Sequence, residues 1–293
     1  MSTFPAERVK PYLALIIMTL LWGYGWTALK IGLIDAPPFL FSAVRMTLSA
    51  FFLLAVLYAS GRPFLPKRIP ELITLGLVQT SLLFTLSTCA VDQGTAGRIA
   101  FLVYTMPFFT LVLAWSILGE KIKGLQWIAI ALAVLGLSAI LQPWSLGENA
   151  TGNLLGIAAG AVWAISVILI KRIQERQPMD LISMTAWQMT FGCIPLLGIT
   201  IVIGEDPITW STRFVTVLLL ISIVITGFGW LLWVYALDKL EAGTASLITL
   251  ASPIIAIGTS AIHLGETPTS IEAVGMLLIT LALIVLGVHA FKV

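Results

Sequence analysis

The most informative residues are aromatic and polar side chains that interrupt long apolar runs. Trp22 and Trp26 are four positions apart and therefore share one face of a helix. Gln79, Tyr104 and Thr105 also lie within apolar stretches. Indole, phenol, amide and hydroxyl groups act by packing and hydrogen bonding. The chemistry that they offer is recognition of a small solute.

The predicted binding site combines these groups with partners from the second half of the chain. Trp22 and Trp163 are expected to face a central cavity from opposite sides, and Phe101 lies one turn before Thr105 and extends that wall. The predicted substrate-binding residues are Trp22, Trp26, Gln79, Phe101, Tyr104, Thr105, Trp163, Trp230, Ser246 and Thr249. No catalytic residue and no metal ligand is assigned, and no cofactor is expected.

Charged side chains are rare inside the apolar runs, and Arg45 is the exception among them. Its guanidinium could hold a carboxylate or phosphate of a solute, or its long side chain could extend to the headgroups of the outer leaflet. The second interpretation is favoured, because the corresponding position in the second half is near the neutral Gln188.

The elements that carry these residues must lie in a membrane. The chain of 293 residues is 59% hydrophobic and only 10% charged, with a mean hydropathy of +1.03. A helix needs about 20 apolar residues to cross a bilayer. Ten such runs occur, at residues 12–33, 39–60, 70–90, 96–118, 123–142, 152–172, 180–203, 212–236, 242–264 and 271–291. Because the runs are continuously apolar rather than alternating, they predict helices and exclude a membrane barrel. The predicted fold is an all-α integral membrane protein with ten transmembrane helices.

The distribution of charge predicts the orientation of these helices. When the loops are assigned alternately to two sides, 12 of the 16 Lys and Arg residues fall on the side of both termini. The positive-inside rule then places both termini in the cytoplasm. The net charge of +2 reflects this topology and indicates no nucleic-acid partner.

The second half of the chain repeats the first. Positions that match at a spacing of 146 residues are Asp92 and Asp238, Ala96 and Ala242, Gly97 and Gly243, Pro107 and Pro253, and Gly119–Glu120 and Gly265–Glu266. The predicted repeats are residues 1–145 and 146–293, with five helices each. Because five is odd, the two repeats must enter the membrane with opposite orientation. Inverted repeats around a central cavity are typical of secondary transporters.

Pro107 and Pro253 recur at matching positions of the two repeats. A proline inside a helix removes a backbone hydrogen bond and clashes with the preceding turn. A break of this kind is tolerated in a membrane where it borders a cavity or another helix. The two prolines are therefore predicted to be hinges beside the central site.

The motifs also carry a family resemblance. The segments "DQGTAGRIAFLVYTMPFFTLVLAWSILGEKI" and "DKLEAGTASLITLASPIIAIGTSAIHLGETP" resemble the EamA-type repeat of the drug/metabolite transporter superfamily. Within it the chain resembles YddG-type amino-acid exporters. The resemblance implies a metabolite exporter of a bacterial inner membrane, with a cavity lined mainly by helices 1, 3, 4, 6, 8 and 9.

The expected function is export of small neutral or aromatic metabolites, with amino acids foremost, by alternating access. The alternatives are a channel or facilitator for small solutes and an exporter of other amphipathic metabolites or drugs. An intramembrane enzyme is disfavoured, because the sequence has no nucleophile–base motif or metal motif. Phosphorylated substrates would need several cations, and Arg45 is the one deep in a run. The expected partners are the solute and the lipid bilayer, and the protein is expected to act as a monomer.

Overall fold

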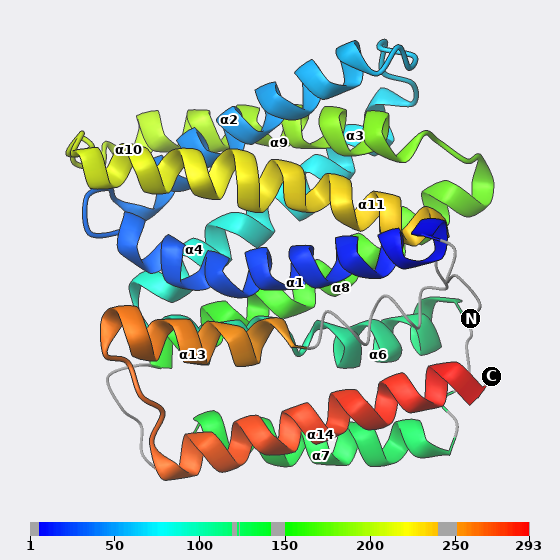
Figure 1. The fold of residues 1–293 in the computed structure, drawn as a ribbon, viewed down its shortest axis with the longest axis vertical. Helices are drawn as coiled ribbons and strands as arrows, with labels where there is room; N and C mark the ends of the chain where they lie inside the picture. Colours follow the sequence, from blue (N-terminus) through cyan, green and yellow to red (C-terminus); the bar gives the residue numbers. More distant parts are fainter. Residues whose placement is uncertain (1–5, 119–121, 123, 142–149, 240–250, 293) are drawn as a thin grey trace.

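The computed structural model describes residues 6–118, 122, 124–141, 150–239 and 251–292, and these ranges contain helices and no strand (Figure 1). In the first half the helices are α1 (Ala6–Gly32), α2 (Pro38–Ala59), α3 (Ile69–Leu75), η1 (Gly76–Leu82), α4 (Leu83–Asp92), α5 (Ala96–Val103), α6 (Met106–Leu118) and α7 (Leu125–Leu141). In the second half they are α8 (Ala150–Arg176), α9 (Leu181–Ile203), α10 (Thr212–Leu219), η2 (Leu220–Phe228), α11 (Gly229–Lys239), α13 (Ser252–Leu264) and α14 (Ser270–Lys292).

The segments η1 and η2 are π-helical, and each lies within a longer helix between two α-helical parts. Among the described residues, seven helices are long and apolar enough to cross a membrane: Val9–Gly32, Pro38–Ala59, Ile69–Asp92, Ala96–Ile117, Ala150–Arg176, Leu181–Ile203 and Thr212–Trp233. Within the same described ranges, three apolar helices are shorter, at Leu125–Leu141, Ser252–Leu264 and Ser270–Val285. The protein is therefore a multi-pass helical membrane protein, and the number of ten spans stays a prediction.

Helices of one half pack mainly on helices of the other. The helix α2 lies along α9, and α7 lies along α14 at the lower edge of Figure 1. In the middle, α1 packs on α11 and α13, while α8 packs on α4 and α6. The pairing is reciprocal, because α1 and α8 are the first helices of their halves and each contacts later helices of the opposite half.

Glycines allow some of these helices to approach closely. A Cβ on Gly136 of α7 would lie 2.8 Å from the carbonyl oxygen of Gly275 on α14, and a Cβ on Gly275 would lie 2.7 Å from that of Gly136. Small residues at such contacts are typical of helix packing in membranes, where close backbone contact replaces the hydrophobic effect as the driving force.

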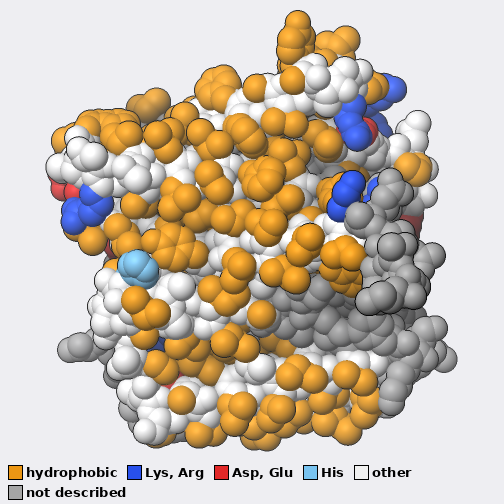
Figure 2. All heavy atoms as spheres, in the orientation of Figure 1, with side chains coloured by type: hydrophobic (Ala, Val, Ile, Leu, Met, Phe, Trp, Pro, Cys, Tyr) orange, Lys and Arg blue, Asp and Glu red, His pale blue; other side chains and the backbone are white. Residues whose placement is uncertain are grey.

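The surface is predominantly apolar along the helices. Figure 2 shows hydrophobic side chains over the visible face, with Lys and Arg gathered toward its left and right edges, where the helices end. Ile201 and Val202 of α9 are 82% and 86% exposed, and many other large apolar side chains are also exposed. A soluble protein rarely exposes so much contiguous apolar surface, so this face is suited to lipid.

The predicted helix over residues 96–118 is divided in the structure. The helix α5 ends at Val103, Tyr104 and Thr105 form a turn, and α6 begins at Met106. Pro107 is the second residue of α6, and Pro253 is the second residue of α13. In the first turn of a helix the missing N–H of proline loses no intrahelical hydrogen bond. The prolines thus begin two helices, and their role as hinges stays a prediction.

Candidate substrate cavity

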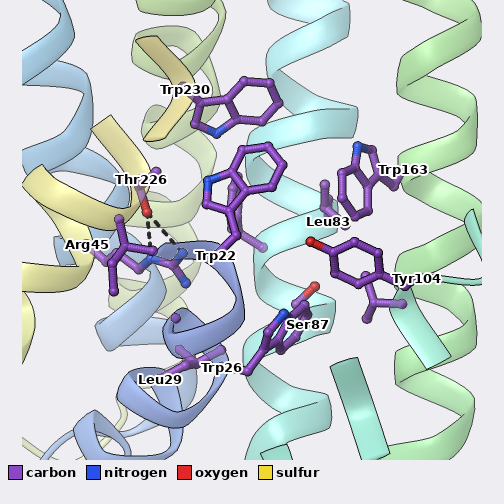
Figure 3. Close-up of a pocket in the computed structure, with 14 residues that line it drawn as sticks. Trp22, Trp26, Leu29, Arg45, Leu83, Ser87, Tyr104, Trp163, Thr226 and Trp230 are labelled. Atoms are coloured by element: carbon purple, nitrogen blue, oxygen red, sulfur yellow. Dashed lines mark hydrogen bonds between the residues drawn. The ribbon is translucent and has the colours of Figure 1, made fainter. Parts of the chain in front are cut away.

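A cavity of about 90 Å³ lies where the two halves meet, and Figure 3 shows the side chains that face it. Its walls come from α1, α2, α4 and α5 of the first half and from α8, η2 and α11 of the second. Because both halves contribute side chains, a relative movement of the halves would change the shape of the cavity.

Aromatic rings form one wall. The ring centroids of Trp22 and Trp163 are 6.4 Å apart at an interplanar angle of 65°, and those of Trp22 and Trp230 are 5.4 Å apart. Tyr104 packs edge-on against Trp163, with centroids 5.6 Å apart. Inclined and edge-to-face arrangements are the favoured geometries of aromatic pairs. The wall therefore consists of rings that hold one another in place.

The cavity brings together five of the predicted substrate-binding residues: Trp22, Trp26, Tyr104, Trp163 and Trp230. Trp22 and Trp26 face it from successive turns of α1, together with Gly25 between them. Tyr104 reaches it from the turn that separates α5 from α6.

Of the other predicted residues, Gln79, Phe101 and Thr105 are described by the structure and are not among those that line this cavity. Gln79 in η1 and Phe101 in α5 are buried among the helices, at 2% and 1% exposure. The Thr105 hydroxyl donates to the carbonyl of Leu102 within the same turn. Ser246 and Thr249 lie outside the described residues.

Arg45 is held inside the protein and faces the cavity. Its side chain is 8% exposed, and its Nε and Nη2 donate to Thr226 Oγ1 at 3.3 and 3.0 Å. The guanidinium carbon lies 5.0 Å from the ring centroid of Phe84, an arrangement that favours a cation. The prediction that Arg45 extends to the lipid headgroups is therefore wrong.

A second polar pair that joins the two halves, Thr80 and Gln188, corresponds to the pair of Thr226 and Arg45. Thr80 Oγ1 donates to Gln188 Oε1 at 2.9 Å, and Gln188 is 1% exposed. Thr80 and Thr226 are 146 residues apart, the same spacing as the repeated motifs, and they lie in η1 and η2. The two π-helical segments therefore each present a threonine to a long helix of the opposite half, to Gln188 on α9 and to Arg45 on α2.

Sequence reasoning missed several cavity residues, notably Ser87, Phe84 and Thr226. A signal for Thr226 exists in the sequence, because its spacing from Thr80 follows the repeat. Ser87 and Phe84 lie near the start of α4, where nothing in the residue types distinguishes cavity-lining positions from helix contacts.

Lys30, near the end of α1, binds the corner between α4 and α5, two helices that contribute side chains to the cavity. Its Nζ donates to the carbonyl oxygens of Val91, Asp92 and Gly94 at 2.7, 3.2 and 2.9 Å. The carbonyls of Val91 and Asp92 belong to the C-terminal end of α4 and that of Gly94 to the turn after it, where a cation is stabilised by the helix dipole and by orphan carbonyls. The contact ties the end of α1 to the α4–α5 corner.

Two carboxylates of the second half cap helices of the first half, at the same end of the bundle as Lys30. Glu205 accepts from the backbone N–H groups of Phe39 and Leu40 at the start of α2, and Glu266 accepts from that of Ala96 at the start of α5. Acidic groups are stabilised at helix N-termini by the free N–H groups and the dipole. Burial raises the pKa of Glu266 above its usual range, against the opposing effect of the Ala96 N–H.

An ion pair joins the two halves at this end as well. Arg213 at the start of α10 forms two hydrogen bonds with the carboxylate of Asp35, at 2.9 and 2.8 Å, and the hydroxyl of Ser211 donates a third at 3.0 Å. The hydrogen bonds from Arg213 hold the pKa of Asp35 below its ordinary value. The loop between α1 and α2 is thereby attached to the second half.

Comparisons with known proteins agree with this architecture. The model of the EamA-like transporter family matches residues 9–142 and again residues 150–288. A "Probable amino-acid metabolite efflux pump" of Salmonella typhimurium is 28% identical, over 98% of this chain and 97% of its own length. Its namesake in Escherichia coli K12 is 26% identical over 93% of each chain, and the "Uncharacterized transporter YoaV" of Bacillus subtilis is 28% identical over 92% of this chain and 94% of its own.

A solved crystal structure has the same fold. It superposes with a TM-score of 0.68 at 17% sequence identity, over 96% of this chain and 98% of its own. The relatives span nearly the whole chain, and the family model covers both halves in succession. The chain belongs to the EamA-like transporter family and carries two copies of its repeat.

Proposed function

We propose that the protein is a secondary transporter that exports small neutral or aromatic metabolites, amino acids foremost, across the bacterial inner membrane by alternating access. The observation that carries this proposal is the aromatic cavity between the two halves, because a site at the junction of two units can open to either side as the units rock. Ten spans, inverted repeats at residues 1–145 and 146–293, and cytoplasmic termini belong to the same proposal.

The reciprocal helix contacts support the inverted arrangement. The helix α1 packs on α11 and α13 in the way that α8 packs on α4 and α6, which is the pairing expected of two equivalent five-helix units. The two matches to the family model support a division near the middle of the chain.

The proposal that amino acids are the substrates rests on the relatives and on the side chains that line the cavity. Two relatives that match over at least 93% of this chain are described as probable amino-acid metabolite efflux pumps. The cavity presents indole rings, a phenol, hydroxyl groups and one cation, which together suit a small solute with an apolar part and a few polar atoms. A phosphate carrier would need further cations to offset the desolvation of its substrate.

The proposal is tested with purified protein in proteoliposomes. Radiolabelled amino acids on the outside should show saturable uptake, and preloaded unlabelled substrate should accelerate it by counterflow. A channel would give non-saturating uptake without counterflow, which would contradict the proposal.

Trp163→Ala is the site variant for this assay, and Trp210→Ala is its matched control. Trp163 lines the cavity, whereas Trp210 lies outside it and is 64% exposed. We expect Trp163→Ala to lose most uptake and Trp210→Ala to retain it. Equal transport of every substrate by the parent and Trp163→Ala would remove this cavity as the site.

A further inference from the structure

We propose that Arg45 is the counterion for a carboxylate of the transported solute, so that the cavity selects aromatic carboxylates and rejects the corresponding amines. The inference rests on the proposed function, since it names the chemical class that the same cavity takes. The amino group of an amino acid is then a tolerated feature of the substrate rather than a required one.

The charge of Arg45 has no counterion among the residues that the structure describes. Its side chain is more than nine-tenths buried, and the contacts of its guanidinium are the neutral hydroxyl of Thr226 and the ring of Phe84. In the part of the chain that the structure describes, no carboxylate lies within ion-pair distance of it. A buried charge without an opposite charge is costly, and the cost is higher in a membrane.

Packing alone does not require a charge at the position of Arg45. In the corresponding pair, the neutral Gln188 makes the equivalent contact with Thr80. Gln188 is also buried, and its Oε1 lies 2.9 Å from Thr80 Oγ1. An amide is therefore sufficient to join a π-helical segment to the facing helix. What distinguishes Arg45 is that it faces the cavity, which Gln188 does not.

The guanidinium of Arg45 has hydrogen-bonding capacity that the described residues do not use. Arginine has five N–H donors, and a single oxygen of Thr226 accepts from Nε and Nη2. With respect to the described residues, Nη1 remains for a ligand, together with the second N–H of Nη2. The planar guanidinium is suited to the two oxygens of a carboxylate, which accept hydrogen bonds strengthened by charge.

The groups around the cavity are distributed in a way that suits an aromatic carboxylate. Figure 3 shows Arg45 on one side, Trp22 and Trp230 above, and the hydroxyl groups of Tyr104 and Ser87 on the opposite side. A carboxylate at Arg45 would leave an aromatic ring of the solute among the indoles. No Asp or Glu is among the described residues that line the cavity, so an ammonium group has no charged partner there. An amine without a carboxylate would add a second cation beside Arg45.

Binding of three matched compounds tests the inference. The purified full-length protein is titrated in a calorimeter with phenylalanine, 3-phenylpropanoate and 2-phenylethylamine, which share a phenyl group and differ in their charged groups. We expect both carboxylates to bind and the amine to bind at least about tenfold more weakly, the ratio that one charge-assisted hydrogen bond provides. Equal binding of the amine and the carboxylates would overturn the inference.

Variants then assign the preference to Arg45. Arg45→Gln, which copies the residue of the other half, should weaken binding of both carboxylates at least about tenfold. Arg45→Lys keeps the charge without the planar pair of donors, so it should bind more weakly than the parent but still prefer carboxylates to the amine. Undiminished binding of 3-phenylpropanoate by Arg45→Gln would overturn the assignment. Equal binding of 3-phenylpropanoate and the amine by Arg45→Lys would also overturn it.

Two threonine variants provide a matched control. Thr226→Val removes the hydroxyl that orients Arg45, and Thr80→Val removes its counterpart in the other half, which is away from the cavity. We expect Thr226→Val to weaken carboxylate binding and Thr80→Val to leave it unchanged. Equal effects of the two variants would mean that the hydroxyls act through packing and would overturn the assignment of an oriented guanidinium.

Flux measurements separate this inference from the proposed function. If carboxylates bind in an Arg45-dependent manner but are not carried in proteoliposomes, the inference stands and the transport proposal fails. If the amine and the carboxylates are carried equally well by the parent and by Arg45→Gln, transport stands and the inference fails.

Discussion

Trp22 on α1 and Trp163 on α8 meet with their ring centroids 6.4 Å apart and their planes inclined at 65°. They are 141 residues apart, and each belongs to the first helix of its half. Each tryptophan therefore brings its ring from the first helix of its half to the same cavity wall, so that a change in one ring alters the support of the other.

This contact predicts coupling between the two tryptophans. Trp22→Ala and Trp163→Ala should each weaken binding of an aromatic solute, and the double variant should weaken it by less than the sum of the two. The expected coupling is about 0.5–1.5 kcal/mol, the range measured for aromatic pairs. Calorimetric titration of the four proteins with phenylalanine completes the cycle. Strict additivity would show that the rings act independently.

The sequence carried enough information for an all-helical, multi-pass membrane architecture and for part of the cavity, whereas the number of ten spans is still a prediction. Runs of apolar residues identify helices because a bilayer leaves the backbone no other partner than itself. The positions of Trp22 and Trp26 follow from helical spacing alone, and both line the cavity.

Helical spacing failed where the helix is interrupted. Phe101 and Thr105 are four positions apart and would share a face in one continuous helix, but the turn at Tyr104 and Thr105 separates α5 from α6. Phe101 consequently joins the core, and Tyr104 reaches the cavity.

The environment of Arg45 was not predictable from its own segment. Its partner Thr226 is 181 residues away in sequence, on a helix whose rotation depends on the π-helical segment η2. Residue type identified a rare intramembrane cation, but only tertiary packing decides whether its long side chain reaches water, lipid headgroups or a neighbouring helix.

Gly160 on α8 is predicted to be intolerant of larger side chains. A Cβ at this position would lie 3.0 Å from the carbonyl oxygen of Val103 and 3.2 Å from that of Leu102, at the break between α5 and α6. Gly160→Leu should lower stability by about 1–3 kcal/mol through overpacking. Gly198→Leu on α9 is the control, because nothing lies within 4 Å of its Cβ. Thermal unfolding in detergent compares them, and equal melting temperatures would contradict the prediction.

The ion pair of Asp35 and Arg213 predicts a stability that depends on acidity. Because Arg213 lowers the pKa of Asp35 in the folded protein, the stabilisation is fully present above the ordinary value of 3.8. It is lost as the pH falls through the lower folded pKa, where the carboxylate takes up a proton.

Thermal unfolding of the parent and of Asp35→Asn between pH 3 and pH 7 tests this sign, with the pH limits chosen to span about one unit below the ordinary carboxyl pKa and three above. The parent should melt higher near neutral pH, and the difference should shrink at the acid end. Asp206→Asn is the control, since Asp206 is exposed and lies on the same loop as Glu205. A difference that grows on acidification would contradict the lowered pKa.

Transport of a neutral amino acid is expected without an imposed pH gradient. Proton-coupled carriers use ionisable groups within the membrane, and none of the described cavity-lining residues is Asp, Glu or His. Uptake into proteoliposomes should follow the gradient of the amino acid and persist when a protonophore is added. Strict dependence on a pH difference would contradict the prediction and would require a proton site elsewhere in the chain.

The two prolines are predicted to control the rate of transport more than the affinity. Pro107 and Pro253 are the second residues of α6 and α13, so that each helix can change direction at its start without losing a backbone hydrogen bond. Alanine allows the preceding residues to become helical, which would favour a continuous and stiffer span. The double variant Pro107→Ala/Pro253→Ala should therefore slow counterflow while solute binding in the calorimeter changes little.

Pro195→Ala is the control, because Pro195 lies inside the unbroken helix α9 and is not among the residues that line the cavity. Equal loss of binding and of counterflow in the double variant would mean that the prolines shape the cavity and do not serve as hinges.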